Sequence, residues 1–149
     1  MRAVVQRVRD CVVRVEGRLT GSIESGLLVY LGVGRNDAES DAAYLCDKIV
    51  NMRIFNDENG KMNLSVLDVK GGILVVSQFT LFGDARGGRR PSYTEAADPV
   101  RARALYEQSL AILARSGAPI AAGEFQAAME VTYTNRGPVT ILLDSEKRF

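Results

Sequence analysis

Residues 26–33, Gly-Leu-Leu-Val-Tyr-Leu-Gly-Val, form an uninterrupted apolar run with the length of one β-strand. Such a run is typical of a strand buried on both faces, whereas half-exposed strands alternate apolar and polar residues. The preceding segments, residues 3–8 and 12–16, are rich in Val and alternate partly with period two. They predict further strands, so the first third of the chain indicates a sheet with residues 26–33 as a central, buried strand.

Two helices are predicted after this sheet. The first covers about residues 38–53, and Asn36 or Asp37 can cap its start. The second begins with Asp98 as its cap and Pro99 at its first position. Apolar spacing places the following residues on the inner faces of the two helices: Ala42, Leu45, Cys46, Ile49, Leu105, Tyr106, Ser109, Ile112 and Leu113.

The remaining segments complete a β-rich domain. Residues 73–80 predict a strand, and residues 82–97 lack any hydrophobic period and predict a long loop. Two final strands flank Gly137-Pro138, which we interpret as the turn of a hairpin; on general grounds its peptide bond is expected to be trans. The elements predict a single α+β domain over residues 1–149, with two main helices and an antiparallel or mixed sheet that closes toward a barrel.

The composition is that of an ordinary globular domain, with 149 residues, of which 46% are hydrophobic and 25% charged. No apolar run reaches the roughly 18 residues that a membrane-spanning helix requires, and the charged N-terminus does not resemble a signal peptide. We therefore expect a cytoplasmic protein. The net charge of +1 is low for a protein that covers long nucleic acid, so any nucleic-acid contact should be local or at the end of a molecule.

The chain contains no histidine. This absence excludes Ser-His-Asp triads, Cys-His pairs and His-ligated zinc. Cys11 and Cys46 are far apart in sequence and are expected to be free, buried thiols. Residues 32–34, Gly-Val-Gly, do not predict a dinucleotide-binding loop, because Asp37 occupies the position of the third glycine. We expect neither a metal nor a cofactor.

Two stretches carry candidate chemistry. Residues 77–80, Ser-Gln-Phe-Thr, place polar groups where an apolar strand meets a flexible loop, although the strand can also simply reach solvent here. Ser77 or Thr80 can act as a nucleophile only beside a Lys, a carboxylate or a substrate group that serves as the base. The loop that follows forms either a phosphate clamp or a solvated surface, and its three arginines are Arg86, Arg89 and Arg90.

The motifs S-Q-F-T-L at residues 77–81 and G-P-V-T at residues 137–140 resemble the two signature motifs of the D-aminoacyl-tRNA deacylase family. The resemblance covers essentially the whole chain. It continues in Q-R-V near the start, V-x-G-x-x-x-G-x-I at residues 15–23, G-L-L-V-x-L-G-V at residues 26–33, R-I-F and G-K-M-N between residues 53 and 63, R-P-S-Y at residues 90–93, and G-x-F at residues 123–125.

The resemblance implies a homodimeric enzyme, with its active sites at the subunit interface, that hydrolyses the ester between a D-amino acid and the terminal adenosine of tRNA and also clears glycine from tRNA. Gly137 and Pro138, joined by a cis peptide bond, would be the chiral selector that enters the partner's site. The other implied catalytic residues, which form the facing wall, are Ser77, Gln78, Phe79 and Thr80. The implied substrate-binding residues are Phe125 and Met129 in the adenosine pocket, Val139 and Thr140 beside the selector, and Arg86, Arg89 and Arg90 as tRNA phosphate contacts.

On this interpretation a steric filter decides which ester is cleaved. The carbonyl oxygens of the selector accept hydrogen bonds from the substrate ammonium and occupy the space that an L side chain needs. Such a filter cannot reject glycine, which is smaller. Because the chain has no histidine, catalysis is expected to rely on the ribose hydroxyl of the RNA and a positioned water, while Thr80 and the backbone N–H groups around Phe79 and Thr80 position the ester and stabilise the oxyanion.

Two alternatives stay open. The first is a non-catalytic module that holds tRNA or another adenosine-bearing ligand in the same pocket. The second is an ester hydrolase that uses Thr80 as a true nucleophile. One residue also departs from the family pattern, because Arg136 stands where an acid is usual. Its effect on hydrogen bonding beside the selector, or on contact with tRNA, is left open.

Overall fold

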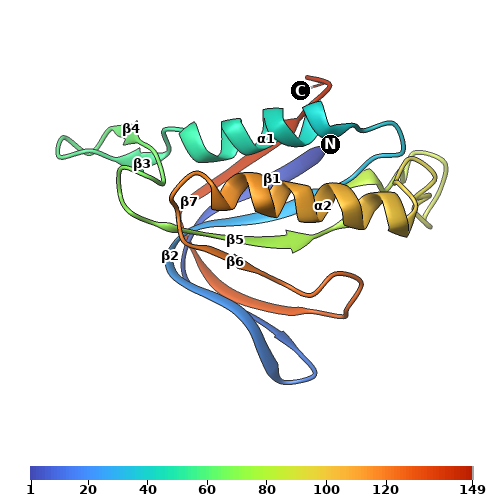
Figure 1. Ribbon diagram of the computed structural model, residues 1–149, viewed down its shortest axis with the longest axis horizontal. Helices are drawn as coiled ribbons and strands as arrows, with labels where there is room; N and C mark the ends of the chain where they lie inside the picture. The colour runs from blue at the N-terminus through green and yellow to red at the C-terminus, as the bar shows by residue number, and fades with distance from the viewer. Residues whose placement is uncertain (149) are drawn as a thin grey trace.

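The computed structural model describes residues 1–148 and shows a five-stranded sheet with two long helices against one face (Figure 1). This mixed α+β class was predicted. The strands lie in the order β6-β5-β2-β1-β7. Their bounds are Arg2–Val15 for β1, Arg18–Gly32 for β2, Gly72–Ser77 for β5, Ile120–Ala122 for β6 and Glu130–Asp144 for β7. The other elements are α1, Glu39–Asn51; α2, Pro99–Ala114; the 3-10 helix η1, Phe79–Phe82; and a separate ladder of β3, Phe55–Asn56, with β4, Met62–Leu64.

The prediction of a buried central strand is confirmed. β2 lies between β1 and β5, and Leu27, Leu28 and Val29 in its second half are 0% exposed. β2 runs antiparallel to β1 and parallel to β5, so the sheet is mixed. Gly26 lies so close to Gly72 of β5 that a Cβ on it would be 1.9 Å from the Gly72 carbonyl oxygen. Glycine is therefore required where these two strands meet.

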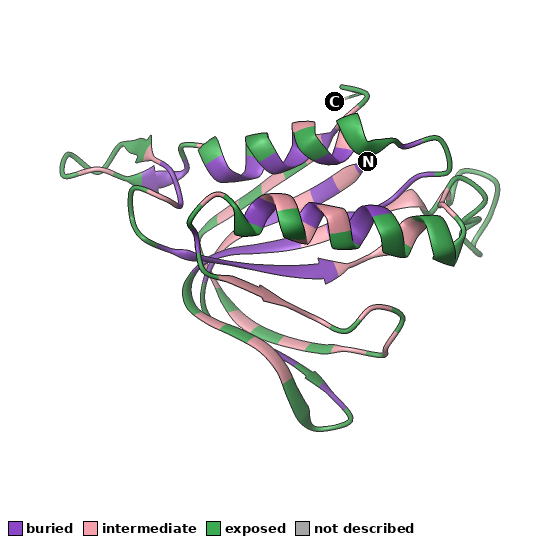
Figure 2. Cartoon of the chain, viewed as in Figure 1, coloured by how far each residue is buried: buried purple, intermediate pink, exposed green. Residues whose placement is uncertain are grey.

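The sheet has an apolar cluster on each face, because successive strand residues point to opposite sides. The larger cluster lies under the helices, and Figure 2 shows buried residues along the sides of α1 and α2 that face the sheet. The inner-face residues predicted for the helices are buried, except Ile112, which is half-buried. The smaller cluster includes Val8, Cys11 and Leu74 on the other face. No helix within residues 1–148 combines the length and the apolar character needed to cross a membrane.

The starts of the two helices were predicted unequally well. Asp98 caps α2, since its carboxylate accepts the first backbone N–H groups of the helix, as predicted. The predicted cap of α1 at Asn36 or Asp37 is wrong. The helix begins after Ala38, whose backbone N–H donates to the Asp41 carboxylate over 2.8 Å. Asp37 does not cap the helix, because groups elsewhere in the fold bind its carboxylate.

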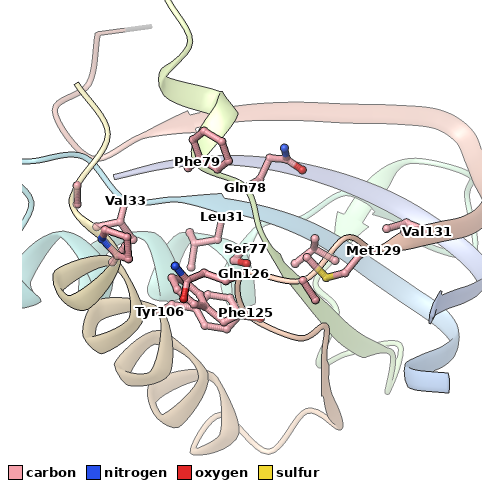
Figure 3. Close-up of a pocket in the computed structure, with 15 residues that line it drawn as sticks. Leu31, Val33, Ser77, Gln78, Phe79, Tyr106, Phe125, Gln126, Met129 and Val131 are labelled. Atoms are coloured by element: carbon pink, nitrogen blue, oxygen red, sulfur yellow. The ribbon is translucent and has the colours of Figure 1, made fainter. Parts of the chain in front are cut away.

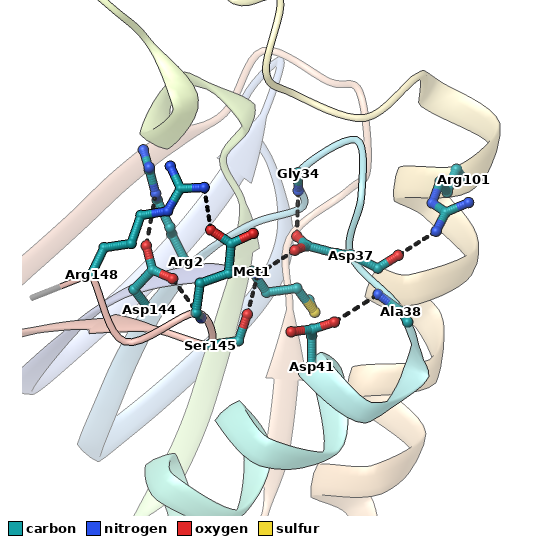
Figure 4. Close-up of polar contacts among 11 residues, drawn as sticks. Met1, Arg2, Gly34, Asp37, Ala38, Asp41, Arg101, Asp144, Ser145 and Arg148 are labelled. Carbon is teal, nitrogen blue, oxygen red and sulfur yellow. Dashed lines mark hydrogen bonds and ion pairs between the residues drawn. The ribbon is translucent and has the colours of Figure 1, made fainter.

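Asp37 is the centre of a buried polar cluster (Figure 4). Its Oδ1 lies 2.6 Å from the amino group of Met1, which also donates to the Ser145 hydroxyl. The other carboxylate oxygen accepts from the Gly34 backbone N–H, and the Asp37 carbonyl accepts from the Arg101 guanidinium. The cluster therefore ties the start of β1 to the β2–α1 connection, to α2 and to the segment that follows β7.

The prediction that the sheet closes toward a barrel is wrong. β6 and β7 form its two edges, and within residues 1–148 no ladder joins them. The sheet does curl, because a Cβ on Gly21 of β2 would lie 2.6 Å from the Ala122 carbonyl oxygen of β6. Closure would require a continuous ladder around every strand, and β6 has only three residues.

The prediction of two final strands joined by a hairpin is also wrong. β7 is one continuous strand, and both of its halves pair antiparallel with β1. Gln6 pairs with Thr140 and Val8 pairs with Asn135, so residues 136–139 bulge out opposite Arg7. The Gly-Pro sequence marks a point where the strand leaves its ladder and rejoins it, without any reversal of the chain.

Candidate active site

A cavity of about 550 Å³ opens where β5 ends, between η1, the first turns of α2 and the segment that leads into β7 (Figure 3). Aromatic rings in its lining come from Phe79, Tyr106 and Phe125, and polar groups come mainly from Ser77, Gln78 and Gln126. Small-molecule pockets typically measure about 300–1,000 Å³, with apolar walls and a few polar groups. The cavity therefore suits a flat, mostly uncharged group such as a nucleoside.

The end of β5 places the Ser-Gln-Phe-Thr stretch at this cavity. The Gln78 backbone N–H donates to the Leu31 carbonyl over 2.8 Å, which extends the pairing with β2, and the chain then turns into η1. Ser77, Gln78 and Phe79 line the cavity, whereas Thr80 lies just outside it and accepts a hydrogen bond from the Gln78 side-chain amide. Phe79 is 57% exposed and packs edge-on against Tyr93, with 5.1 Å between ring centroids.

Phe125 and Met129, which the resemblance assigns to the adenosine pocket, line the cavity together with Tyr106 and Gln126, which it did not assign. Tyr106 was expected only as a helix inner-face residue. Its hydroxyl donates to the Val75 carbonyl over 3.0 Å, and its ring lies 5.7 Å from that of Phe125. Gln126 carries a positive φ of 66°, which marks a tight change of direction in the chain beside the cavity.

No acidic or basic side chain of residues 1–148 lines this cavity. Among the described residues that line the cavity, Tyr106 is the one titratable group, and burial raises its pKa to about 12. The residues that line the cavity can therefore bind a ligand by hydrogen bonds and by close packing, but none of them can act as a general base.

The two cysteines are free and buried, as predicted, and burial raises the pKa of each thiol to about 11. In the described part of the chain, no group of three or more His, Cys, Asp or Glu residues is placed to hold a metal.

Gly137 and Pro138 lie in the bulge of β7 and are exposed. The peptide bond between them is cis, as the resemblance implied. Asn135 holds the bulge closed, since its Oδ1 accepts from the Val139 backbone N–H and its Nδ2 donates to the Thr140 hydroxyl, each over 3.2 Å. Within residues 1–148, no residue of the bulge lines the cavity. A single chain therefore does not bring the Ser-Gln-Phe-Thr and Gly-Pro-Val-Thr motifs together at this cavity.

Arg7 supports the bulge from β1. Its Nε donates to the Arg136 carbonyl over 3.0 Å, and its Nη1 donates to the Ile54 carbonyl over 2.6 Å and to the Asn56 side chain over 3.3 Å. Since Arg7 contacts the main chain of Arg136, an arginine there leaves this support unchanged. The unusual residue beside Gly137 is thus compatible with the loop geometry.

The three loop arginines are not equivalent. Arg86 forms a two-pronged ion pair with Asp84, at 2.9 Å and 2.7 Å, and these hydrogen bonds hold the pKa of Asp84 well below its usual range. The pair therefore stays ionised at neutral pH, and Arg86 lines a separate open hollow. Arg89 and Arg90 are exposed, and within residues 1–148 neither has an ion pair or a side-chain hydrogen bond.

A family model described as D-Tyr-tRNA(Tyr) deacylase matches residues 4–144. The chain belongs to this family. Among its relatives, a D-aminoacyl-tRNA deacylase of Koribacter versatilis (strain Ellin345) is 60% identical over 149 residues, with 100% of each chain covered. A D-aminoacyl-tRNA deacylase of Thermosipho africanus (strain TCF52B) is 56% identical over 149 residues, again with 100% of each chain covered.

Two solved structures share the fold of this D-Tyr-tRNA(Tyr) deacylase family member. The c-Myc DNA Unwinding Element Binding Protein superposes with a TM-score of 0.90 at 38% identity, covering 97% of this chain and 98% of its own. A probable eukaryotic D-amino acid tRNA deacylase superposes with a TM-score of 0.79 at 16% identity, covering 95% and 97%. The latter similarity shows the fold alone.

Proposed function

We propose that this protein hydrolyses the ester bond of D-aminoacyl-tRNA, and also that of Gly-tRNA, in the cytoplasm. The observation that carries the proposal is the apolar cavity at the end of β5, which presents Ser77, Gln78 and Phe79 in a chain of the D-Tyr-tRNA(Tyr) deacylase family. The experiment that tests it is a time course of D-Tyr-tRNA hydrolysis by the purified protein. Ester loss well above the spontaneous rate is expected, and loss at the spontaneous rate would contradict the proposal.

In this proposal the cavity holds the terminal adenosine, with its base against Phe125 and Met129. The ester then lies at the cavity edge beside η1. Phe79 and Thr80 are the first two residues of η1, and the first N–H groups of a helix have no acceptor within the helix. We propose that these two N–H groups stabilise the oxyanion of the tetrahedral intermediate. Because the cavity lining offers no general base, the neighbouring ribose hydroxyl of the RNA and a water carry out the proton transfers.

In this proposal the Thr80 hydroxyl also donates to the oxyanion, so Thr80→Ala, which removes that hydroxyl and keeps the backbone N–H, is expected to lower kcat for D-Tyr-tRNA by about 10- to 100-fold, the value of one hydrogen bond to a charged group. Removing a true nucleophile costs on the order of 10⁶-fold. Single-turnover rates on Thr80→Ala measure the difference, with Thr132→Ala, which removes an exposed hydroxyl on β7, as the control. Complete loss of hydrolysis with intact tRNA binding, together with a trapped acyl-enzyme, would instead establish Thr80 as the nucleophile.

The chiral selector in this proposal is the Gly137-Pro138 bulge of a second copy of the chain. Two observations support it: the bulge is exposed, and the cavity of its own chain takes no lining residue from it within residues 1–148. A second copy that inserts the bulge would place main-chain oxygens against the α-carbon of the bound amino acid. An L side chain then meets those oxygens, while hydrogen and a D side chain avoid them. Val139 and Thr140, which form hydrogen bonds with Asn135 in the same segment, would bind the substrate beside the selector.

Contacts with the tRNA backbone are assigned to Arg89 and Arg90. The double variant Arg89→Glu/Arg90→Glu is expected to raise KM for D-Tyr-tRNA by about tenfold or more. It should also reduce the slope of log(kcat/KM) against log[salt] by roughly 1.5, because each phosphate contact contributes about 0.7–0.9. The double variant Asp84→Asn/Arg86→Gln is the matched control, because it removes a balanced ion pair from the same loop and leaves the local net charge unchanged. If the double variant Arg89→Glu/Arg90→Glu had the same salt slope as the wild type, neither Arg89 nor Arg90 would contact the tRNA phosphates.

A non-catalytic nucleic-acid-binding module is the competing function. The DNA-binding name of one solved relative is the observation that raises it. The net charge of +1 does not favour binding along a duplex. Stable tRNA binding without ester loss would support the module, and equal hydrolysis of D and L esters would support a non-selective hydrolase.

A further inference from the structure

Two residues that line the cavity contact a cation that the mechanism above does not use. Arg103 lies on α2, and its guanidinium carbon is 4.7 Å from the ring centroid of Phe125. Its Nη2 lies 3.5 Å from the side-chain oxygen of Gln126. Phe125 and Gln126 both line the cavity. Arg103 is therefore a charged side chain fixed against two lining residues, at the edge of a cavity whose own lining carries no charge.

The guanidinium of Arg103 still has hydrogen-bonding capacity. Its contact with Glu107 is 3.7 Å long and lies one helical turn away, and the Gln126 contact is at the limit of a hydrogen bond. Its side chain is 49% exposed. By contrast, Arg18 and Arg86 form contacts of 2.6 Å and 2.7 Å with carboxylates. Stacking on Phe125 orients the planar fork of Arg103 while leaving donors for a further anion.

A terminal adenosine in this cavity brings one anion with it, the phosphate that joins its 5′ oxygen to the preceding nucleotide. We propose that Arg103 is a substrate-binding residue that binds this phosphate. The proposal rests on the proposed function, which places the terminal adenosine in the cavity. An arginine fork suits a phosphate because two parallel N–H groups can reach two of its oxygens. Arg103 then recognises the phosphate that links the adenosine to the rest of the RNA, whereas the cavity binds the nucleoside itself.

The proposal is tested by binding of two probes, adenosine and adenosine 5′-monophosphate, which differ by the phosphate alone. The wild type is expected to bind the monophosphate about tenfold more tightly than adenosine. Arg103→Met keeps the apolar stem and removes the charge, and it should bring the ratio of the two Kd values to about one while leaving the Kd of adenosine unchanged. Arg115→Met, which removes a cation from the far end of α2, should keep the wild-type ratio.

A monophosphate preference that survives in Arg103→Met, or a wild type without any preference, would overturn the proposal. Equal weakening of both probes would also overturn it, since Arg103 would then only hold Phe125 in place. With D-Tyr-tRNA, Arg103→Met should raise KM by about tenfold and leave kcat within about twofold. Failure of the wild type to cleave D-Tyr-tRNA would refute the proposed function, whereas the ratio of the two Kd values decides the role of Arg103 independently.

Discussion

Replacing Gly137 by alanine is expected to lower kcat/KM for D-Tyr-tRNA by about a hundredfold, because misplacement of a positioning group by about 1 Å has effects of this size. A Cβ at this position would lie 2.7 Å from Nη2 of Arg7 and 2.9 Å from Cγ2 of Val139. The residue also has a φ of 131°, which L side chains rarely adopt. The variant must therefore shift Arg7 or the bulge, and either movement displaces the exposed Gly-Pro segment.

Gly17→Ala is the matched control for this variant. Gly17 also has a positive φ, of 77°, but a Cβ there would meet nothing within 4 Å, and it lies in the β1–β2 turn. It should lose some stability while keeping kcat/KM. Steady-state kinetics and thermal unfolding of both variants separate the two effects. Wild-type kcat/KM in Gly137→Ala would show that the bulge has no part in the reaction.

Replacing Asp37 by alanine is expected to lower the free energy of unfolding by about 3–5 kcal/mol, the usual cost of removing one partner of a buried ion pair. The Met1 side chain is 0% exposed, and the buried amino group of this residue would lose its only carboxylate contact among residues 1–148. The Gly34 backbone N–H would lose its acceptor in the same change. This single substitution therefore loosens the contact between β1, the β2–α1 connection and α2.

Chemical denaturation of Asp37→Ala measures this loss, with Glu58→Ala as the control. Glu58 is exposed in the loop between β3 and β4, and removal of its carboxylate should change the free energy of unfolding by no more than about 0.5 kcal/mol. If both variants unfolded at the same denaturant concentration, the buried cluster around Asp37 would not contribute to the stability of the fold.

The elements that were predicted correctly are those encoded by local patterns. The apolar run at residues 26–33 and the helical spacing of Leu105, Tyr106 and Ser109 report their burial directly. The elements that were predicted wrongly depend on distant partners. Asp37 does not cap α1, because the amino group of Met1 binds its carboxylate. Gly137-Pro138 is not a hairpin turn, because β1 pairs with the chain on both sides of it.

The residues of the candidate site also fall into a group that was predicted from the sequence and a group that was not. The resemblance singled out Ser77, Gln78, Phe79, Phe125 and Met129, and the fold brings these together at one cavity. It did not indicate Tyr106, since a helical residue that faces the core and one that faces a cavity have the same spacing. The pairing of Arg86 with Asp84 was also missed, although a carboxylate two residues before an arginine is a signal that was available.

Hydrolysis of three esters of one tRNA, carrying D-Tyr, L-Tyr or Gly, is the measurement that decides whether this protein selects its substrate by handedness. All three are followed at the same enzyme concentration and corrected for spontaneous hydrolysis. We expect rapid loss of the D-Tyr ester, measurable loss of the glycyl ester, and an L-Tyr ester that decays at the spontaneous rate. Loss of the L-Tyr ester at the rate of the D-Tyr ester would contradict chiral selection by this fold.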